Sequence, residues 1–155
     1  MRKNEAKFTT VFFSEAGTKN KNNDYFGYVQ LDNYAIWVVA DGFDEEEGAD
    51  VAARLAVESA IEYFMLHPEF SREIISEIML YANLKVREKQ TETERYSLMH
   101  TSLLIVISNY NALLYGNIGN TRFYHLRNGY VISQSSDDTV AQLLVEEEYR
   151  RFKIS

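Results

Sequence analysis

The chain has 155 residues, the size of one domain, and 46% of them are hydrophobic, which is enough to build a core. Its net charge of −7 disfavours nucleic acids and anionic membranes as partners, since both would repel it, and is compatible with a divalent cation. The absence of cysteine excludes disulfides and thiolate metal sites. Neither a secretory signal at residues 1–10 nor a run of roughly 20 apolar residues is visible, so we expect a soluble, cytoplasmic protein.

Three strands are predicted in the first quarter of the chain. Residues Lys7 to Ser14 and Asp24 to Leu31 are rich in β-branched and aromatic side chains. Ala35 to Ala40 is a continuous apolar run, which is typical of a strand buried on both faces. The second and third strands should pair antiparallel, because only a short turn separates them. That pairing could bring Asp24 and Asp41, at the two strand ends, to a shared site.

The Asp41-Gly42 pair directly follows the buried third strand. A carboxylate at the end of an apolar strand needs a partner, and a hard cation that prefers oxygen ligands is one. Glycine allows the backbone to come close to a ligand. The acids from Asp44 to Glu47 are interpreted differently, as a solvated loop whose charge complements the positive end of the helix that follows.

Two helices are predicted in the middle of the chain. The first runs from about Ala49 to Leu66 with apolar residues at helical spacing, and His67-Pro68 ends it, because the residue before proline avoids the helical conformation. The second begins after Ser71, which can cap it, and continues to about Lys89. Residues Gln90 to Ser97 are polar and should form a loop.

The last third is predicted to contain four strands and a final helix. Asn128-Gly129 is a strong hairpin signal between two of the strands. Because strands cluster instead of alternating with helices, the order favours an antiparallel α+β fold with helices laid on sheets. The predicted strands are Thr101–Ser108, Ala112–Ile118, Arg122–Leu126 and Tyr130–Ile132, and the helix Thr139–Glu148 follows a cap at Asp137-Asp138.

Other common sites find no support in the sequence. The three histidines, His67, His100 and His125, are far apart and show no zinc-binding spacing, so structural roles are favoured for them. There is no glycine-rich phosphate loop of the P-loop or dinucleotide type. The acidic loop after Asp41 does not follow the spacing of a calcium-binding loop.

Four segments in this order resemble the metal-dependent, type 2C (PPM-type) Ser/Thr protein phosphatases. Residues 17–24, GTKNKNND, are similar to the family pattern G-x-R-x-x-N-E-D. Residues 38–52 carry the Asp-Gly pair and a later Gly-Ala-Asp-Val-Ala. Residues 100–102, HTS, are similar to G-T-T, and residues 117–122, NIGNTR, to N-x-G-D-S-R, followed by Asp137-Asp138-Thr139-Val140. The resemblance covers essentially the whole chain.

The resemblance implies an α+β fold, an antiparallel β-sandwich flanked by helices in α-β-β-α order. It also implies two divalent cations, Mn²⁺ or Mg²⁺, that activate a water for attack on phosphoserine or phosphothreonine. By position, Asp41 and the carbonyl of Gly42 would be metal ligands. Asp24 would hold metal-bound water, and Lys19 stands where the family's arginine grips the phosphate.

Several positions depart from the family pattern. Lys19 replaces a phosphate-binding arginine, so a single ammonium charge stands where the guanidinium group would make a bidentate contact with phosphate. Asn23 and Asn120 each replace a carboxylate, His100 replaces a glycine, and the Gly-Gly-His after the Asp-Gly pair is lost. The family's later aspartates, which complete its metal site, have no place before Ser155.

Residues 1–155 are therefore interpreted as a single type 2C phosphatase-like domain that is apparently truncated. We expect weak or absent hydrolysis of phosphoserine and phosphothreonine by this chain. The alternative is a non-catalytic pseudophosphatase that binds a phosphoprotein or a regulatory protein. Because the missing strands would leave sheet edges and core faces uncovered, we also expect a homo-oligomer.

Overall fold

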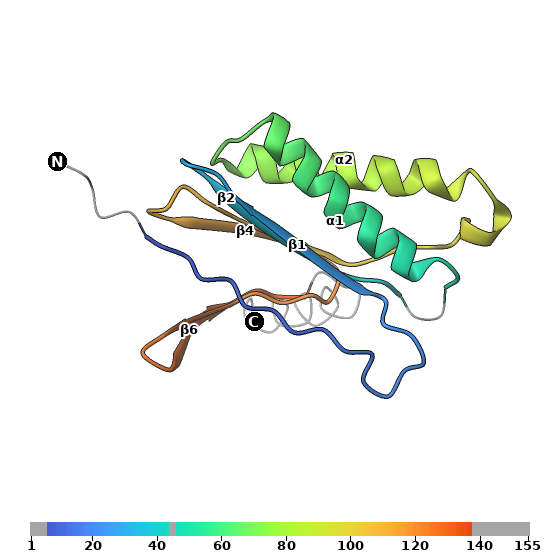
Figure 1. Ribbon diagram of the computed structural model, residues 1–155, viewed down its shortest axis with the longest axis horizontal. Helices are drawn as coiled ribbons and strands as arrows, with labels where there is room; N and C mark the ends of the chain where they lie inside the picture. Colours follow the sequence, from blue (N-terminus) through green and yellow to red (C-terminus); the bar gives the residue numbers. More distant parts are fainter. Residues whose placement is uncertain (1–5, 44–45, 138–155) are drawn as a thin grey trace, which may run out of the picture.

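The computed structural model describes residues 6–43 and 46–137. Its centre is a four-stranded antiparallel sheet with the strand order β1-β2-β3-β4. Two helices cover one face of this sheet, and a β-hairpin and the extended N-terminal segment lie on the opposite side (Figure 1). The strands are β1 (Asp24–Gln30), β2 (Ala35–Asp41), β3 (Leu103–Ser108), β4 (Leu113–Ile118), β5 (Tyr124–Arg127) and β6 (Tyr130–Gln134), and the helices are α1 (Ala49–Leu66) and α2 (Arg72–Gln90). The predicted α+β class with antiparallel sheets is confirmed.

Strand β2 occupies an interior position in the sheet, as its apolar sequence predicts. Ile36 and Val38 face the helices and are at most 1% exposed, within the main hydrophobic core. The alternate residues Trp37, Val39 and Asp41 project from the opposite face, because side chains alternate along a strand. The third strand, β3, is buried along its whole length. The two faces of β2 thus separate the helix-side core from the side on which Asp41 lies.

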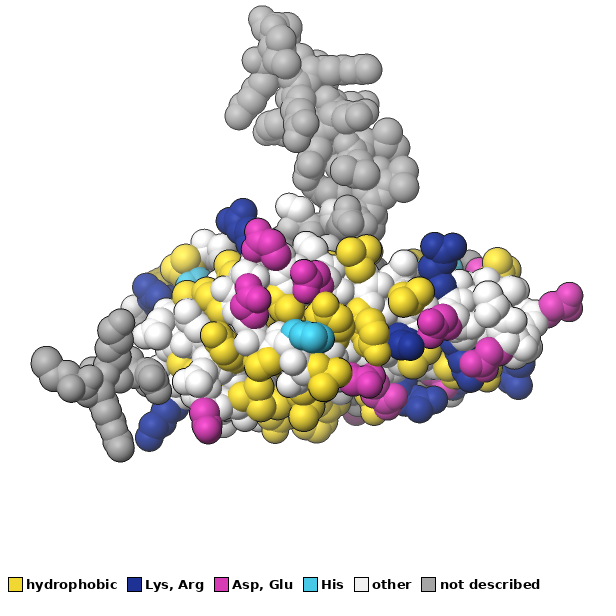
Figure 2. Space-filling model, turned by 90° about the horizontal axis from the view of Figure 1, so that it is seen from above, with side chains coloured by type: hydrophobic (Ala, Val, Ile, Leu, Met, Phe, Trp, Pro, Cys, Tyr) yellow, Lys and Arg dark blue, Asp and Glu magenta, His cyan; other side chains and the backbone are white. Residues whose placement is uncertain are grey.

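Both predicted helices are confirmed, and their ends are where the sequence signals place them. The Ser71 hydroxyl accepts a hydrogen bond of 3.1 Å from the Ile74 N–H and caps α2. A row of alanines on α1 lets this helix lie close to the sheet, and Phe64 fills the space at its C-terminal end. On the helix side of the molecule, charged side chains of both signs lie among apolar ones (Figure 2). Neither helix of the described part of the chain is long and apolar enough to cross a membrane.

The hairpin at Asn128-Gly129 is confirmed, with strands β5 and β6 slightly displaced from the predicted bounds. Asn128 has φ 52° and Gly129 has φ 81°. Two successive residues with positive φ are what a tight hairpin turn requires, and asparagine and glycine are the residues that tolerate it. A short 3₁₀ helix, η1 (Glu94–Tyr96), interrupts the predicted loop after α2. The predicted final helix, residues 139–148, lies outside the described residues.

The predicted strand from Lys7 to Ser14 is wrong. These residues run along the outer side of the sheet but belong to no strand. Their contacts are made by side chains: the Phe8 ring lies edge-on to Trp37, and the Phe12 ring lies against Phe26 with centroids 3.8 Å apart. A segment rich in β-branched and aromatic residues has side chains that pack well on a sheet. A strand also requires a neighbouring strand whose backbone it can hydrogen-bond. Within the described ranges, no strand forms backbone hydrogen bonds with this segment.

Candidate functional site

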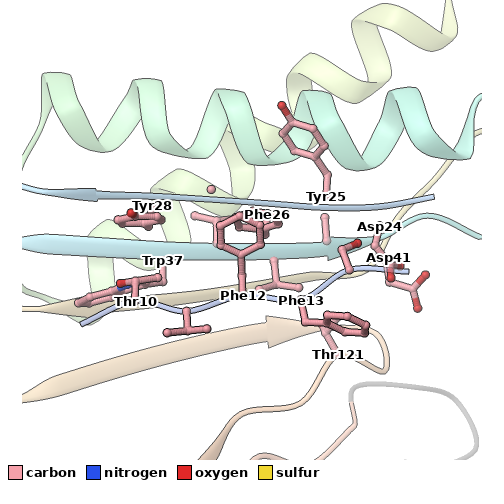
Figure 3. A pocket seen from close by; sticks show the side chains of 16 residues that line it. Thr10, Phe12, Phe13, Asp24, Tyr25, Phe26, Tyr28, Trp37, Asp41 and Thr121 are labelled. Carbon is pink, nitrogen blue, oxygen red and sulfur yellow. The ribbon is translucent and has the colours of Figure 1, made fainter. Parts of the chain in front are cut away.

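Asp24 and Asp41 lie directly opposite each other in the antiparallel pair of β1 and β2. Because opposed residues share a face of the sheet, both side chains project away from the helices. Both residues line the same cavity, and Figure 3 shows their side chains together at one end of it, near Phe13 and Thr121. The expectation that neighbouring strands bring these two acids together is therefore confirmed.

Hydrogen bonds to the 100–102 segment fix the backbone at the end of β2. The Asp41 N–H donates to the Ser102 hydroxyl at 3.2 Å, and the Ser102 N–H donates to the Asp41 carbonyl at 2.9 Å. Two residues further on, the Phe43 N–H donates to the His100 carbonyl at 3.1 Å. The Ser102 side chain is buried, so Asp41 is held by a polar contact that water does not compete for. The backbone carbonyl of His100 thus helps to hold this strand end.

The Asn23 carbonyl holds the other side of the same strand end. It accepts a hydrogen bond of 3.2 Å from the Gly42 N–H. Next to it, the Asp24 N–H donates to the Asn22 side-chain oxygen at 3.0 Å, which shapes the entry of the chain into β1. The 22–24 segment and the 100–102 segment therefore hold the Asp41-Gly42 pair between them.

Gly42 has a packing requirement that the sequence did not reveal. A Cβ atom at this position would lie 2.3 Å from the carbonyl oxygen of Ala49, in the first turn of α1. Real Cβ atoms do not come that close to a backbone oxygen, so a side chain here would push β2 and α1 apart. The glycine thus allows the helix, rather than only a ligand, to approach the strand end.

The cavity next to the two aspartates has a volume of about 490 Å³. It lies between residues 10–14 and the outer face of β1 and β2, where the rings of Phe12 and Phe26 lie close together (Figure 3). The lining residues with aromatic rings are Phe12, Phe13, Tyr25, Phe26, Tyr28 and Trp37. Thr121 also lines it, and its hydroxyl is buried and has no hydrogen-bond partner among the described residues. Thr121 belongs to the segment 117–122 that carries part of the resemblance, but sequence reasoning gave it no role in the site.

The structure does not bring Lys19 into this cavity. Lys19 is exposed in a turn, where its N–H donates to the Ala16 carbonyl at 3.0 Å. Another lysine, Lys21, which sequence reasoning did not single out, forms an ion pair of 2.7 Å with Asp50 in the first turn of α1. The hydrogen bond from Lys21 lowers the pKa of Asp50 below its usual range.

The donor chemistry of the site fits Mn²⁺ or Mg²⁺, because Asp24, Asp41 and the Gly42 carbonyl offer only oxygen atoms. The number of carboxylates is small. Among the described residues, no group of three or more histidine, aspartate or glutamate side chains is placed to hold a metal ion. Asn120, which stands at a carboxylate position of the resemblance, is exposed and offers an amide. The described part of the site is thus a pair of carboxylates.

A comparison with protein-family models identifies the family to which these residues belong. The model described as protein phosphatase 2C matches residues 14–149. The chain belongs to the protein phosphatase 2C family. The matched residues include the paired aspartates, the Asp-Gly turn and the segment around Ser102. A comparison with curated proteins gave no match.

Solved phosphatase structures share the fold of this family member. The PPM Ser-Thr phosphatase MsPP of Mycobacterium smegmatis, in complex with cacodylate, is 25% identical with a TM-score of 0.66, over 84% of this chain and 53% of that one. Stp1 of Staphylococcus aureus is 18% identical with a TM-score of 0.76, over 96% and 62%. The catalytic domain of PstP, in complex with two manganese ions, is 23% identical with a TM-score of 0.66, over 84% and 56%. The chain thus spans 53 to 62% of the length of these relatives.

Proposed function

We propose that this chain supplies the Asp24–Asp41 part of a metal-dependent phosphatase site that hydrolyses phosphoserine and phosphothreonine in cytoplasmic proteins. The observation that carries the proposal is the direct cross-strand pairing of Asp24 and Asp41 at one end of the cavity (Figure 3). Opposed residues of an antiparallel pair lie on the same face of the sheet, so the two carboxylates can offer oxygen atoms to one divalent cation or to the water around it.

The proposed roles follow from the positions of the residues. The Asp41 carboxylate and the Gly42 carbonyl would hold the cation, and Asp24 would accept hydrogen bonds from water next to it. Bound Mn²⁺ or Mg²⁺ supplies a lowered water pKa and neutralises phosphoryl charge. The Ser102 hydroxyl fixes the backbone of Asp41 and so orients its carboxylate. Lys19 lies outside the cavity, so its contact with phosphate rests on the resemblance and would be that of a single point charge.

Two findings support manganese and weak activity. The related PstP domain was solved with two manganese ions, which makes Mn²⁺ the first cation to test. The described residues contribute only a pair of carboxylates, whereas two cations need more negative ligands to share. We therefore propose slow hydrolysis, or none, by the chain alone.

The small number of carboxylates also favours a second candidate function. A chain that keeps the fold, with an amide at Asn120 and no third acid beside this pair among the residues that the structure describes, could act as a pseudophosphatase that binds a phosphoprotein or a regulatory protein. Such a module would use the aromatic cavity and the strand ends for recognition instead of chemistry.

Hydrolysis of a small aryl phosphate separates the two candidates. The full chain is assayed with Mn²⁺ or Mg²⁺, next to Asp41→Asn, Asp24→Asn and the control Asp32→Asn, which changes an exposed acid in the β1–β2 turn. A phosphatase predicts metal-dependent turnover that Asp41→Asn lowers by at least about a hundredfold and that the control leaves unchanged. No turnover with metal, together with binding of phosphopeptides, supports the second candidate. Turnover that is the same in Asp41→Asn contradicts the proposed site.

A further inference from the structure

The side of α2 that is turned away from the sheet carries two exposed leucines. Ile74, Ile78 and Ala82 are buried on the inner side of this helix, whereas Leu80 is 68% and Leu84 is 50% exposed. A single exposed leucine on a protein surface needs no explanation. These two are four residues apart, so they lie next to each other on one face of the helix. This face looks outward from the helix layer of the molecule (Figure 1).

The two leucines belong to a row of exposed residues along α2, here called the seam. The seam consists of Glu73, Glu77, Leu80, Leu84 and Arg87. At about 100° per residue, all five fall within roughly 80° of the helix circumference. Their intervals alternate between four and three residues, which is the spacing with which two helices pack along each other in a coiled coil. The helix α2 therefore has a second possible packing face, opposite the one that it buries on the sheet.

The charges of the seam are not used within the chain. Beside the seam, Lys85 forms an ion pair of 3.0 Å with Glu88. In the part of the chain that the structure describes, Glu73, Glu77 and Arg87 form no ion pair. The seam is thus acidic towards the N-terminus of α2, apolar in the middle and basic towards the C-terminus.

We propose that the seam of α2 packs antiparallel against the seam of a second copy of this chain. Leu80 of each copy lies against Leu84 of the other, and Glu77 of each copy lies against Arg87 of the other. This twofold arrangement buries the four leucines and forms two equivalent ion pairs. It does not depend on metal binding or on phosphatase activity. The homo-oligomer that we expect from the sequence would form through a helix face and not through sheet edges.

The leucines and the charges together select this arrangement. A shift of seven residues in one direction would place Glu77 against Leu80, and a shift in the other direction would place Leu84 against Arg87. Each shift sets a charge against an apolar side chain and loses both ion pairs. A parallel arrangement would place every seam residue against itself, so that like charges would meet at both ends. Only the antiparallel arrangement centred on the leucines avoids these contacts.

Two leucines of equal exposure test the apolar centre of the interface. Leu66, at the end of α1 and outside the seam, is 68% exposed, as is Leu80. Light scattering over a range of concentrations should show a monomer–dimer equilibrium of the unmodified chain. Leu80→Ser should raise the dissociation constant at least about tenfold, because each dimer loses both leucine contacts, and the control Leu66→Ser should leave it unchanged. A monomer at every concentration, or a dimer that both substitutions affect equally, would overturn the proposal.

A charge exchange tests the antiparallel orientation. Glu77→Arg and Arg87→Glu should each weaken self-association at least about tenfold, because each variant brings like charges together at both ends of the interface. Mixed in equal amounts, the two variants should form a heterodimer as strong as the unmodified dimer, since every charge then meets its opposite. The substituted side chains are exposed, so far-ultraviolet circular dichroism should show unchanged helix content. A mixture that stays monomeric, or single variants that dimerise like the unmodified chain, would contradict the proposed interface.

Discussion

Replacing Ser102 with alanine should lower both the thermal stability of the chain and its affinity for Mn²⁺. Ser102 is 1% exposed, and its hydroxyl accepts the Asp41 N–H at 3.2 Å. Without the hydroxyl, a backbone N–H at the end of β2 is left without its partner, which costs about 1–3 kcal/mol. For a chain of this size the melting temperature should fall by roughly 2–4 °C for each kcal/mol. Loss of the contact also frees the backbone that orients Asp41, so Mn²⁺ affinity should fall about tenfold.

Ser108→Ala is the matched control for this prediction. Ser108 is also 1% exposed, at the far end of β3, where its hydroxyl donates to the Ala112 carbonyl and accepts the Tyr110 N–H, both at 2.9 Å. This variant should lose as much thermal stability as Ser102→Ala and bind Mn²⁺ like the unmodified chain. Differential scanning calorimetry gives the stability and titration calorimetry the affinity. Equal losses of affinity in both variants, or none in Ser102→Ala, would refute the reasoning.

Two further predictions concern the surroundings of the site. Gly42→Ala should destabilise the fold by about 1–3 kcal/mol in urea unfolding, because its Cβ would lie 2.3 Å from the Ala49 oxygen; an unchanged unfolding midpoint would show that α1 moves freely. The Lys21 ion pair lowers the pKa of Asp50 in the folded chain. The pair therefore stabilises the fold fully above the unfolded-state pKa of about 3.9, and this stabilisation is lost as the pH falls through the lowered folded-state pKa. Lys21→Met should therefore cost up to about 1 kcal/mol at pH 7, since the pair is largely exposed, and little at pH 2; an equal cost at both pH values would argue against this ion pair.

Local signals in the sequence located most of the helices and turns. Pro68 marks the end of α1, Ser71 caps α2, and Asn128-Gly129 turns the hairpin, because each acts through its own backbone or that of its neighbours. The pairing of Asp24 with Asp41 was also within reach, since a short turn fixes the register of the two strands around it.

Contacts between distant segments could not be predicted in this way. The hydroxyl of Ser102 meets Asp41 across 61 residues, and no spacing rule connects the two. Gly42 suggested a ligand site, whereas the structure shows that the nearby backbone of Ala49 requires it. Residues 7–15 have the composition of a strand, but whether a segment pairs depends on the neighbour that the fold provides.

Titration of the full chain with Mn²⁺ by calorimetry tests the proposed metal site most directly. The unmodified chain and the turn variant Asp32→Asn should bind the cation with the same affinity. Asp41→Asn should lose binding, because it removes the carboxylate that β2 and Ser102 hold at the strand end. Binding that persists in Asp41→Asn, or no binding of Mn²⁺ or Mg²⁺ by the unmodified chain, would contradict a metal site between these two strands.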